Sequence, residues 1–441
     1  MSRLDGPGAA LLRLVAAASL DDLPRPALES ARLAVLDWWG VTVAGATEPV
    51  AELVRAASPA PAGPASVLGT DRSAPPLAAA LWNGTAAHAL DFDDVTLALP
   101  GHLTAPLLPG MLALAEARRL SGRSLLTAFV AGAEVTGRLA RALGRGHYRA
   151  GWHATATLGR LGAAAGCGRL LGLDAAGIDR AVGLAAAQLG GIQESFGTMA
   201  KPFQVGRAAA DGLLAALLAE AGATGPAGLL DRAEWARRLS PEWSPERLAR
   251  GLGAEWEIAG IIFKRYPCCF ATHAAIAAVL DLVPCPDPDA VESVELAVCP
   301  TALQIADQRA PRTGLAGKFS VSYCVASALL RGHVRETDFA DAAVRAPALQ
   351  AVAARVRLEA RPEFDETRAR AVVRLRDGTV REAAADLRAS LDPARVRREL
   401  GEKFRALVAP RLGPAAGRLE AQLGAVDELP DMAGLARASV A

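Results

Sequence analysis

The sequence predicts a mainly α-helical protein, with a large all-helical domain and a smaller α+β domain. Two observations predict this fold class: apolar residues recur at helical spacing up to about residue 265, and beyond residue 290 they alternate at strand spacing. The 441 residues also exceed the roughly 250 to 300 residues at which a single hydrophobic core stops growing. We therefore expect a helical domain over 1–265, completed by C-terminal helices over 396–441, and an α+β domain over 266–395.

The helical domain is expected to contain one helix after another, separated by Gly and Pro. The first clear helix is "PALESARLAVLDWWG", which begins with Pro26, is apolar along one face and is expected to end at Gly40. Another begins at Thr104, a residue type that caps helices, has Pro106 in its first turn and is expected to end at Gly122. Further helices are expected at 124–143, 155–171, 175–189 and 205–221.

The α+β domain is predicted from three strand-like segments. Apolar and polar residues alternate in "VESVELAV" and in "ARVRLEARPEF". In "RARAVVRLRDGTVREAAA", Asp377 and Gly378 lie between two β-prone runs, which indicates a hairpin. The intervening "GKFSVSYCVASALLRG" is expected to be a helix, and the chain is expected to be helical again from about residue 396.

Composition and charge limit the possible partners. Forty-eight basic and forty-seven acidic residues leave a formal charge of +1, without a like-charge run that would bind nucleic acid or a membrane surface. No apolar stretch approaches the roughly 18 residues of a membrane span. The six cysteines form no CxxC pair, which fits reduced thiols in a cytoplasm and not the ligands of an iron–sulfur cluster. We expect a cytoplasmic protein with a small-molecule partner.

One segment concentrates titratable side chains. "HALDFDDVTLALPGH", residues 88–102, holds three aspartates and two of the six histidines. Carboxylates at the C-terminal end of a helix are opposed by the helix dipole, which favours a functional role. A metal site, a diphosphate site, proton transfer and a structural helix end are all open here. A prenyl-transfer type of Mg²⁺ site is disfavoured, because the spacing is DxDD and no second Asp-rich segment accompanies it.

Three titratable residues, the first of them from this same segment, are expected in loops directly before helices: His102, His153 and Lys201. Helix N-termini offer free N–H donors and a partial positive charge, so converging N-termini would bind carboxylates.

Lysine is rare in this chain, which has four lysines among its forty-eight basic residues. We expect lysine where a compact, titratable ammonium is required. Lys264 lies beside Arg265 at the predicted domain boundary, where clefts form. Lys318 lies near Tyr323 in the smaller domain, and a tyrosine hydroxyl in a basic cleft could lend a proton.

A resemblance to a known family rests on six segments in this order: "LPRPALESARLAVLDWWGVTVAG", "NGTAAHALDFDD", "GWHATATLGRLGAAAGCGRLLGL", "GTMAKPFQVGRAAADG", "FKRYPCCFATHAAI" and "GKFSVSYCVASALLRG". Together they resemble the MmgE/PrpD family, which contains 2-methylcitrate dehydratase, cis-aconitate decarboxylase and iminodisuccinate epimerase. The resemblance implies a helical domain, a smaller α+β lid domain, a homodimer, and a site between the domains that uses neither cofactor nor metal.

The resemblance also implies a set of site residues. The catalytic residues would be Asp91, His102, His153, Lys201, Lys264 and Tyr323, and the substrate-binding residues would be Thr96, Gln204, Arg265, Cys269 and His273.

The sequence departs from the family's pattern at three positions. Val95 replaces the threonine that follows "DFDD" in the decarboxylase branch, and Cys269 replaces a histidine of that branch. Gln204 stands where many members have histidine. In addition, "PCCFATH" does not match the "PAEFH" that the dehydratase branch carries after the lysine segment.

The expected function is that of a lyase that abstracts a proton next to a carboxylate of a small di- or tricarboxylate. A 2-methylcitrate dehydratase-like hydro-lyase is expected first; a decarboxylase, an epimerase and a non-catalytic carboxylate binder are the alternatives. We expect Lys201, Lys264 and Arg265 to hold carboxylates and the histidines to exchange the proton. Asp91 would orient one imidazole, and Tyr323 would protonate a leaving hydroxyl.

Overall fold

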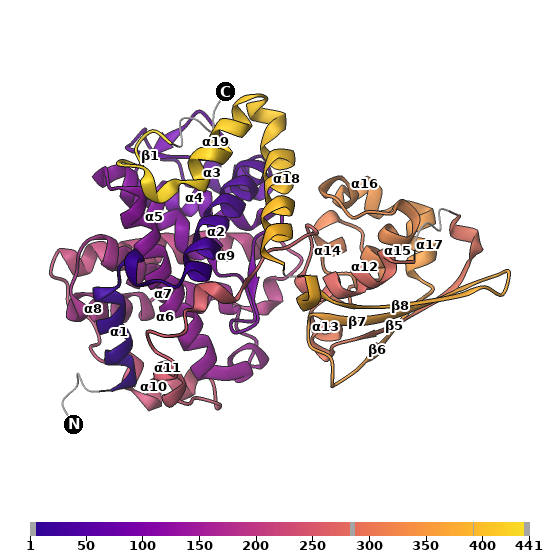
Figure 1. Ribbon diagram of the computed structural model, residues 1–441, viewed down its shortest axis with the longest axis horizontal. Coiled ribbons are helices and arrows are strands. Elements are labelled where there is room, and N and C mark those ends of the chain that lie inside the picture. The colour runs from indigo at the N-terminus through magenta and orange to yellow at the C-terminus, as the bar shows by residue number, and fades with distance from the viewer. Residues whose placement is uncertain (1–5, 283–286, 391, 436–441) are drawn as a thin grey trace.

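In the computed structural model, a large body of helices lies beside a smaller α+β body, and helix α18 runs along the side of the large body that faces the small one (Figure 1). The structure describes residues 6–282, 287–390 and 392–435. The predicted fold class is confirmed. Residues 1–5 and 436–441, at the ends of the predicted helical domain, lie outside the described residues.

The large body is formed by two stretches of chain. Its helices from the first stretch are α1 (Pro7–Ala17), α2 (Arg25–Gly45), α3 (Pro49–Ala57), α4 (Pro76–Ala89), α5 (Thr104–Arg118), α6 (Gly122–Arg149), α7 (Ala154–Leu170), α8 (Ala175–Ala186), α9 (Ala200–Glu220), α10 (Ala233–Leu239) and α11 (Glu246–Ala249). Helices α18 (Pro393–Leu412) and α19 (Ala415–Gly424) return to it, and side chains of both belong to its hydrophobic core.

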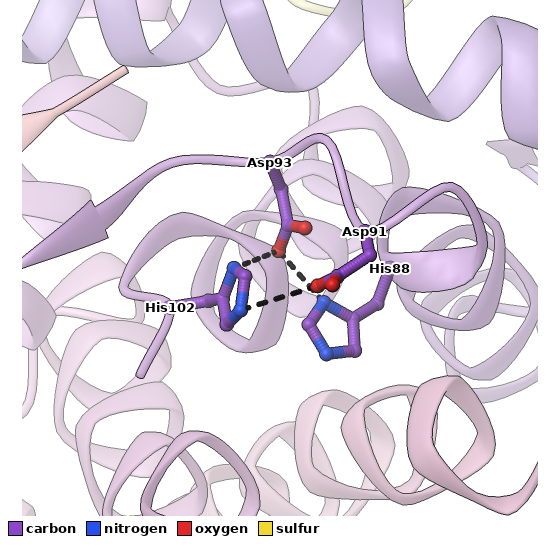
Figure 2. Close-up of side chains that lie close together, drawn as sticks. All are labelled: His88, Asp91, Asp93 and His102. Atoms are coloured by element: carbon purple, nitrogen blue, oxygen red, sulfur yellow. Dashed lines mark hydrogen bonds and ion pairs between the residues drawn. The ribbon is translucent and has the colours of Figure 1, made fainter. Parts of the chain in front are cut away.

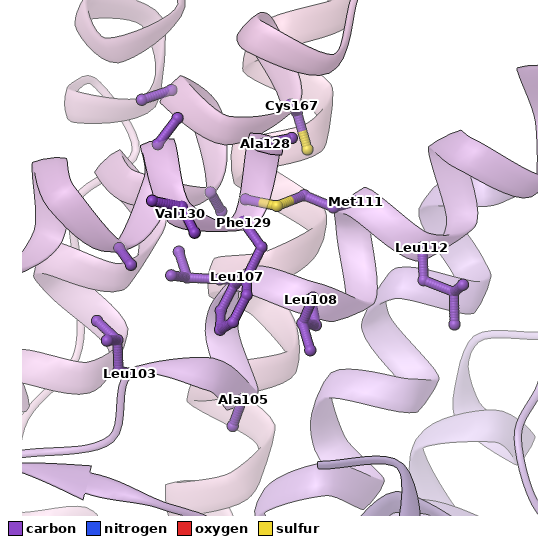
Figure 3. Packing of buried hydrophobic residues seen from close by; sticks show 14 of the residues in the cluster. Leu103, Ala105, Leu107, Leu108, Met111, Leu112, Ala128, Phe129, Val130 and Cys167 are labelled. Atoms are coloured by element: carbon purple, nitrogen blue, oxygen red, sulfur yellow. The ribbon is translucent and has the colours of Figure 1, made fainter. Parts of the chain in front are cut away.

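Close packing of small residues brings the central helices together. Leu107, Met111 and Phe129 interdigitate with Cys167 in the core between α5, α6 and α7 (Figure 3). At Gly162 of α7 an added Cβ would lie 1.8 Å from Thr136 Oγ1 of α6, so only glycine allows this approach.

Several predicted helix ends differ from the structure. Helix α5 ends at Arg118 and not at Gly122, which is the first residue of α6, and α6 continues past the predicted end at 143 to Arg149 across a kink at Gly144. Helix α2 continues through Gly40 to Gly45, because Gly40 is a packing position: a Cβ there would lie 3.0 Å from the ring of Phe404 in α18. Helix α9 begins at Ala200 and not at 205, so Lys201 lies in the first turn of the helix and not in the loop before it. For α2, the sequence predicts that Gly40 ends the helix, although a glycine inside a helix can also be a packing position. For α9, the sequence predicts a loop before residue 205.

The lid domain contains a four-stranded sheet with the order β6-β5-β7-β8. Its strands are β5 (Val291–Val298), β6 (Val356–Ala360), β7 (Arg368–Leu375) and β8 (Val380–Asp386). Strand β5 pairs parallel with β6 and antiparallel with β7, and the predicted hairpin joins β7 to β8 with Gly378 at φ 88°. The helices of this domain are α12 (His273–Leu280), α13 (Pro300–Ile305), α14 (Gly314–Gly317), α15 (Val321–Arg331), α16 (Asp341–Val344) and α17 (Pro347–Ala353).

Short strands complete the helical body. Strands β1 (Ala65–Ser66) and β2 (Ser73–Ala74) pair with each other. Strand β3 (Val95–Thr96) pairs antiparallel with β4 (Ile261–Ile262). This second pair ties the segment that follows the three aspartates to the segment that leads to Lys264, and so it positions the site.

Two further findings concern the whole described chain. None of its described helices is long and apolar enough to cross a membrane. The five cysteines in the described ranges are buried and free, and Cys285 lies outside them.

Candidate active site

A tight turn after helix α4 places the first two of the three aspartates toward the boundary between the domains. The helix ends at Ala89, and Asp91 follows with a left-handed backbone, φ 51°. Aspartate and asparagine adopt this conformation more readily than other non-glycine residues, because their short polar side chains can bond locally. Asp94 then accepts hydrogen bonds from the backbone N–H groups of Leu103 and Thr104, both at 3.2 Å, and so caps helix α5.

All four lysines of the chain bond to the turn at residues 90–92. Lys318 Nζ donates to the carbonyl of Leu90 at 2.5 Å, and Lys264 Nζ donates to the carbonyl of Asp91 at 2.8 Å. Lys403 Nζ donates to the carbonyl of Phe92 at 2.7 Å. Three consecutive carbonyls thus each accept an ammonium from a different part of the chain: the lid domain, the segment between the domains, and α18.

The carboxylate of Asp91 is held by two of these lysines. Its Oδ1 accepts Lys201 Nζ at 2.7 Å and Lys264 Nζ at 3.0 Å. Burial opposes ionisation of this carboxyl, yet the two ammoniums outweigh burial and hold the pKa of Asp91 well below its usual value. In turn Asp91 raises the pKa of Lys264 against the effect of burial. The turn therefore carries a carboxylate and two ammoniums at neutral pH.

Asp93 lies between two histidines (Figure 2). Its Oδ2 is 2.8 Å from His88 Nδ1 and 3.0 Å from His102 Nδ1. The two imidazoles, with burial opposing them, hold the pKa of Asp93 well below its usual value. Because an ionised carboxylate can only accept, it favours the tautomer of His88 with the proton on Nδ1. The contact with His102 Nδ1 is an ion-pair contact by distance and lacks hydrogen-bond geometry. The sequence had given this orienting role to Asp91, whose Oδ1 lies 3.5 Å from His102 Nε2.

His153 has its tautomer fixed by Gln204. Its Nδ1 lies 2.9 Å from Gln204 Oε1, and the same oxygen accepts the backbone N–H of Ile192 at 3.3 Å. Since the oxygen is the acceptor in both contacts, His153 Nδ1 carries the proton and Nε2 has a free lone pair. This Nε2 is buried and has no hydrogen-bond partner among the described residues. Gln204, which stands where many family members have histidine, thus sets the tautomer of His153.

Burial keeps the histidines uncharged. It lowers the pKa of His102 to about 3, and with the ammonium of Lys201 it lowers the pKa of His153 well below its usual value. Both imidazoles are therefore neutral at physiological pH and able to accept a proton.

These groups border one cavity between the helical body and the lid. Six of the predicted residues line it: Asp91, Thr96, His102, His153, Lys201 and Cys269. Its apolar wall contains Val95, Leu97, Phe196, Phe270, Ile305 and Phe319. Arg145, Tyr148 and Glu366 add polar groups to the lining. Burial raises the pKa of Cys269 to about 12, so its thiol stays protonated.

The other predicted residues lie elsewhere. Tyr323 is fully buried in the core of the lid, where its hydroxyl donates to the carbonyl of Asp338. Arg265 pairs with Glu399 of α18 at 3.0 Å, and the ring of His273 packs against Tyr266. Neither Arg265 nor His273 borders this cavity.

Two more predicted residues act from outside the cavity lining. Gln204 contacts it only through His153, as described above. Lys264 lies behind Asp91, where its ammonium bonds to that residue and does not face the cavity. The expected carboxylate-binding trio of Lys201, Lys264 and Arg265 is therefore reduced to Lys201.

Four side chains of the site have the geometry to hold a cation. His88, Asp91, Asp93 and His102 each offer one ligand atom, and these atoms lie within 4.8 Å of one another. The ammoniums of Lys201 and Lys264 already neutralise Asp91, however, and they would repel a second positive charge at this distance. The donor set therefore fits a metal ion poorly.

Several site residues escaped the sequence analysis. His88 and Asp93 belong to the aspartate-rich segment, and their five-residue separation across a helix end was the available signal. Tyr148 lies five residues before His153 in "GHYRAGWH", which would have been a reason to include it. Glu366 precedes a strand in the lid, and no local pattern marks it.

Comparison with known proteins identifies the family of this chain. Residues 9–246 match the MmgE/PrpD N-terminal domain, and residues 266–428 match the MmgE/PrpD C-terminal domain. The cis-aconitate decarboxylase-like protein oryM of Aspergillus oryzae is 30% identical over 419 residues, which is 88% of this chain and 87% of that protein. Cis-aconitate decarboxylase of Mus musculus is 30% identical over 69% of this chain and 66% of that protein. The Aspergillus terreus enzyme of the same name is 31% identical over 59% of this chain and 57% of its own length.

Proposed function

Because this chain belongs to the MmgE/PrpD family, we propose that it acts on a small di- or tricarboxylate and transfers a proton at a carbon next to a carboxylate. It is an enzyme of the lyase class, as the decarboxylases related to it are. The observation that carries the proposal is that His153 and Lys201 border the same buried cavity. One offers an imidazole nitrogen with a free lone pair, and the other offers an ammonium.

Lys201 is the carboxylate-binding group of this proposal. One of its three N–H donors is used by Asp91, which leaves donors for a substrate carboxylate. The rings of Phe196 and Phe319 lie 5.5 and 5.1 Å from Nζ and shield the ammonium from water. In such surroundings a charge-assisted hydrogen bond is stronger than in water, so one carboxylate is held and oriented.

His153 is the proton carrier of this proposal. In the empty site it is neutral, but the negative charges of a bound substrate favour the protonated imidazole and raise its pKa toward neutrality. A group whose pKa lies near the working pH can both take up and deliver a proton. His102, whose Nδ1 lies 3.0 Å from Asp93, lines the same cavity and is the second candidate for this task.

Decarboxylation of a cis-aconitate-like tricarboxylate is the reaction we place first. The bond between the carbon skeleton and one carboxylate breaks, CO₂ leaves, and the electron pair stays on the skeleton until it takes a proton. The apolar wall formed by Leu97, Phe270 and Ile305 offers no donor to a carboxylate, which favours its release as neutral CO₂. The related decarboxylases from fungi and mammals support this choice.

Dehydration is the second candidate. The sequence-based preference for a hydro-lyase relied on Tyr323 to protonate the leaving hydroxyl, and that residue lies in the lid core. Tyr148, however, borders the cavity, and in this reaction its phenol group takes the place of Tyr323 as the proton donor to the leaving hydroxyl. A 2-methylcitrate-like substrate would then lose water while His153 accepts the proton from the neighbouring carbon.

Proton NMR in D₂O tests the proposal. Purified protein would be incubated separately with cis-aconitate, 2-methylcitrate and iminodisuccinate. We expect CO₂ and an unsaturated dicarboxylate with one deuterium from cis-aconitate. An alkene from 2-methylcitrate would move the assignment to dehydration, and deuterium exchange without loss of a group would move it to epimerisation. If none of the three acids reacts or exchanges, the proposed proton transfer is refuted.

The His153→Asn variant assigns the proton transfer to one residue. We expect turnover to fall by about 10² or more, because the amide cannot carry a proton. His333→Asn, at a half-exposed lid histidine that does not border the cavity, is the control and should keep wild-type turnover. A homodimer and independence from added cofactors also belong to the proposal; light scattering checks the first.

A further inference from the structure

We propose that Arg145 binds a second carboxylate of the substrate, and that Glu366 of the lid domain occupies this guanidinium while the cavity is empty. The proposal rests on the carboxylate substrate proposed above. It assigns a role to two residues that the family resemblance did not supply.

The two side chains form a fork across the boundary between the domains. Arg145 NH1 donates to Glu366 Oε1 at 2.8 Å, and NH2 donates to Oε2 at 3.2 Å. Both residues line the cavity that contains Lys201 and His153. A guanidinium presents two parallel donors to any carboxylate in this way, so a substrate carboxylate can replace that of Glu366 without a change in geometry.

A kink in the backbone of helix α6 positions Arg145. Helix α6 is interrupted at Gly144, with φ 60° and ψ −166°, directly before Arg145. Only glycine adopts such a backbone without strain. The carboxylate of Glu242 then accepts the backbone N–H of Gly146 at 3.0 Å and stabilises the restarted helix. The kink therefore has supporting contacts on its C-terminal side.

The charges of the cavity lining require a second receptor. Two fully cationic side chains line the cavity, Lys201 and Arg145, and each is paired with an internal carboxylate, Asp91 or Glu366. A di- or tricarboxylate brings at least two negative groups, and Lys201 can hold one of them. Arg145 is the other cation that lines the cavity, and its partner Glu366 comes from the lid domain, whereas Asp91 belongs to the same helical body as Lys201.

An adjoining surface depression would attract such a substrate. It is lined by Arg141, Arg145, Arg247 and Arg250, and thus shares Arg145 with the cavity. Arg141 is paired with Glu255 and Glu257, and Arg145 with Glu366, whereas Arg247 and Arg250 add positive charge that attracts anions. Arg145 lines both this depression and the cavity of Lys201.

Calorimetric binding measurements with three probes test the proposal: cis-aconitate, maleate and crotonate, which carry three, two and one carboxylates. We expect Arg145→Gln to weaken binding of cis-aconitate and maleate by about tenfold or more, which corresponds to the loss of one charge-assisted contact, and to leave crotonate binding unchanged. Glu366→Gln, which removes the internal competitor, should tighten cis-aconitate binding. The double variant leaves no unpaired charge and should still bind cis-aconitate weakly.

The control is Arg149→Gln, on the same helix, at an exposed arginine that pairs with Glu242 and lies outside the cavity lining. It should bind all three acids as the wild type does, and thermal unfolding checks that each variant is folded. Equal weakening of all three acids by Arg145→Gln, or an effect below twofold on cis-aconitate, would overturn the proposal. All of these variants are made in the His153→Asn background, in which turnover of cis-aconitate is expected to be about 10² or more slower, so that the measured heat is that of binding. If the wild type binds none of the acids, this inference and the proposed substrate class both fail.

Discussion

The ammonium of Lys318, in the lid domain, lies 2.5 Å from the carbonyl oxygen of Leu90, in the helical body. Leu90 directly precedes Asp91, so one hydrogen bond joins the lid to the turn that carries the site carboxylate. The next residue, Phe319, lines the cavity and packs beside Lys201. Neighbouring residues of one short segment in the lid domain therefore contact both the turn and Lys201.

Replacement of Lys318 by methionine should lower both activity and stability. The apolar chain can keep the packing, but the buried carbonyl of Leu90 loses its donor, which costs about 1 to 3 kcal/mol of unfolding free energy. We expect kcat to fall by about tenfold, since the turn and the lid lose their common contact. Steady-state kinetics and urea unfolding measure the two effects. Wild-type kcat in a destabilised variant would show that this lysine is only structural; Arg118→Gln, at an exposed ion pair, is the control.

Replacement of Gln204 by glutamate should shift the pH–rate profile upward. A carboxylate 2.9 Å from His153 Nδ1 stabilises the protonated imidazole more than the amide does, so the pKa of His153 rises. We expect the limb of the profile that reports His153 to move to higher pH. Gln204→Leu removes the acceptor and should reduce kcat without such a shift. An unchanged profile in Gln204→Glu would remove His153 from the proton transfer.

Asp94 should make stability depend on pH. Burial, with a smaller contribution from Asp93, raises the pKa of this carboxyl to about 7. In the unfolded chain it loses its proton near its ordinary value of about 4. Between these values the folded state keeps a proton that the unfolded state has lost, so the contribution of Asp94 to the free energy of unfolding falls as the pH rises toward 7.

The Asp94→Asn variant isolates this contribution. The amide oxygen can still accept the N–H groups of Leu103 and Thr104, but it does not titrate. Urea unfolding at about pH 5 and about pH 8 should show a smaller loss of stability in the variant than in the wild type, by about 1 to 3 kcal/mol. All other carboxyl groups are common to both proteins. An identical pH dependence would mean that Asp94 is ionised in the folded state.

Removal of metal ions should leave activity unchanged. The ligand atoms of His88, Asp91, Asp93 and His102 are near one another, but the ammoniums of Lys201 and Lys264 oppose a cation there. We expect the same turnover after dialysis against a chelator, and no gain on addition of Zn²⁺, Mn²⁺ or Mg²⁺. Activity that is lost on dialysis and restored by one of these ions would show that the cluster is a metal centre.

The fold could be predicted from the sequence because its signals are local. The hairpin at Asp377–Gly378 and the long amphipathic helices depend on residues within a few positions of one another. The continuation of α2 through Gly40 could not be predicted in this way, because it depends on Phe404, more than three hundred positions away. A glycine that permits contact between helices and a glycine that ends a helix look alike in the sequence.

The site could be predicted in part for a similar reason. Asp91, His102, His153 and Lys201 lie in distinctive segments, and the structure brings them to one cavity. Tyr323 was assigned from its residue type, but the direction of its side chain depends on the packing of α15 in the lid. The pairing of Arg145 with Glu366 joins two unremarkable segments 221 positions apart, and only the tertiary structure shows it.

The gathering of every lysine at the turn of residues 90–92 has a practical consequence for handling this protein. The side chains of Lys201, Lys264 and Lys318 are buried, and that of Lys403 is only 9% exposed. Amine-directed reagents, such as the esters used to attach dyes or to couple proteins to sensor surfaces, therefore find no well-exposed lysine on the folded molecule. Such reagents would label the chain heavily only when the lid or the turn opens, and labelling at lysine thus reports opening of the site.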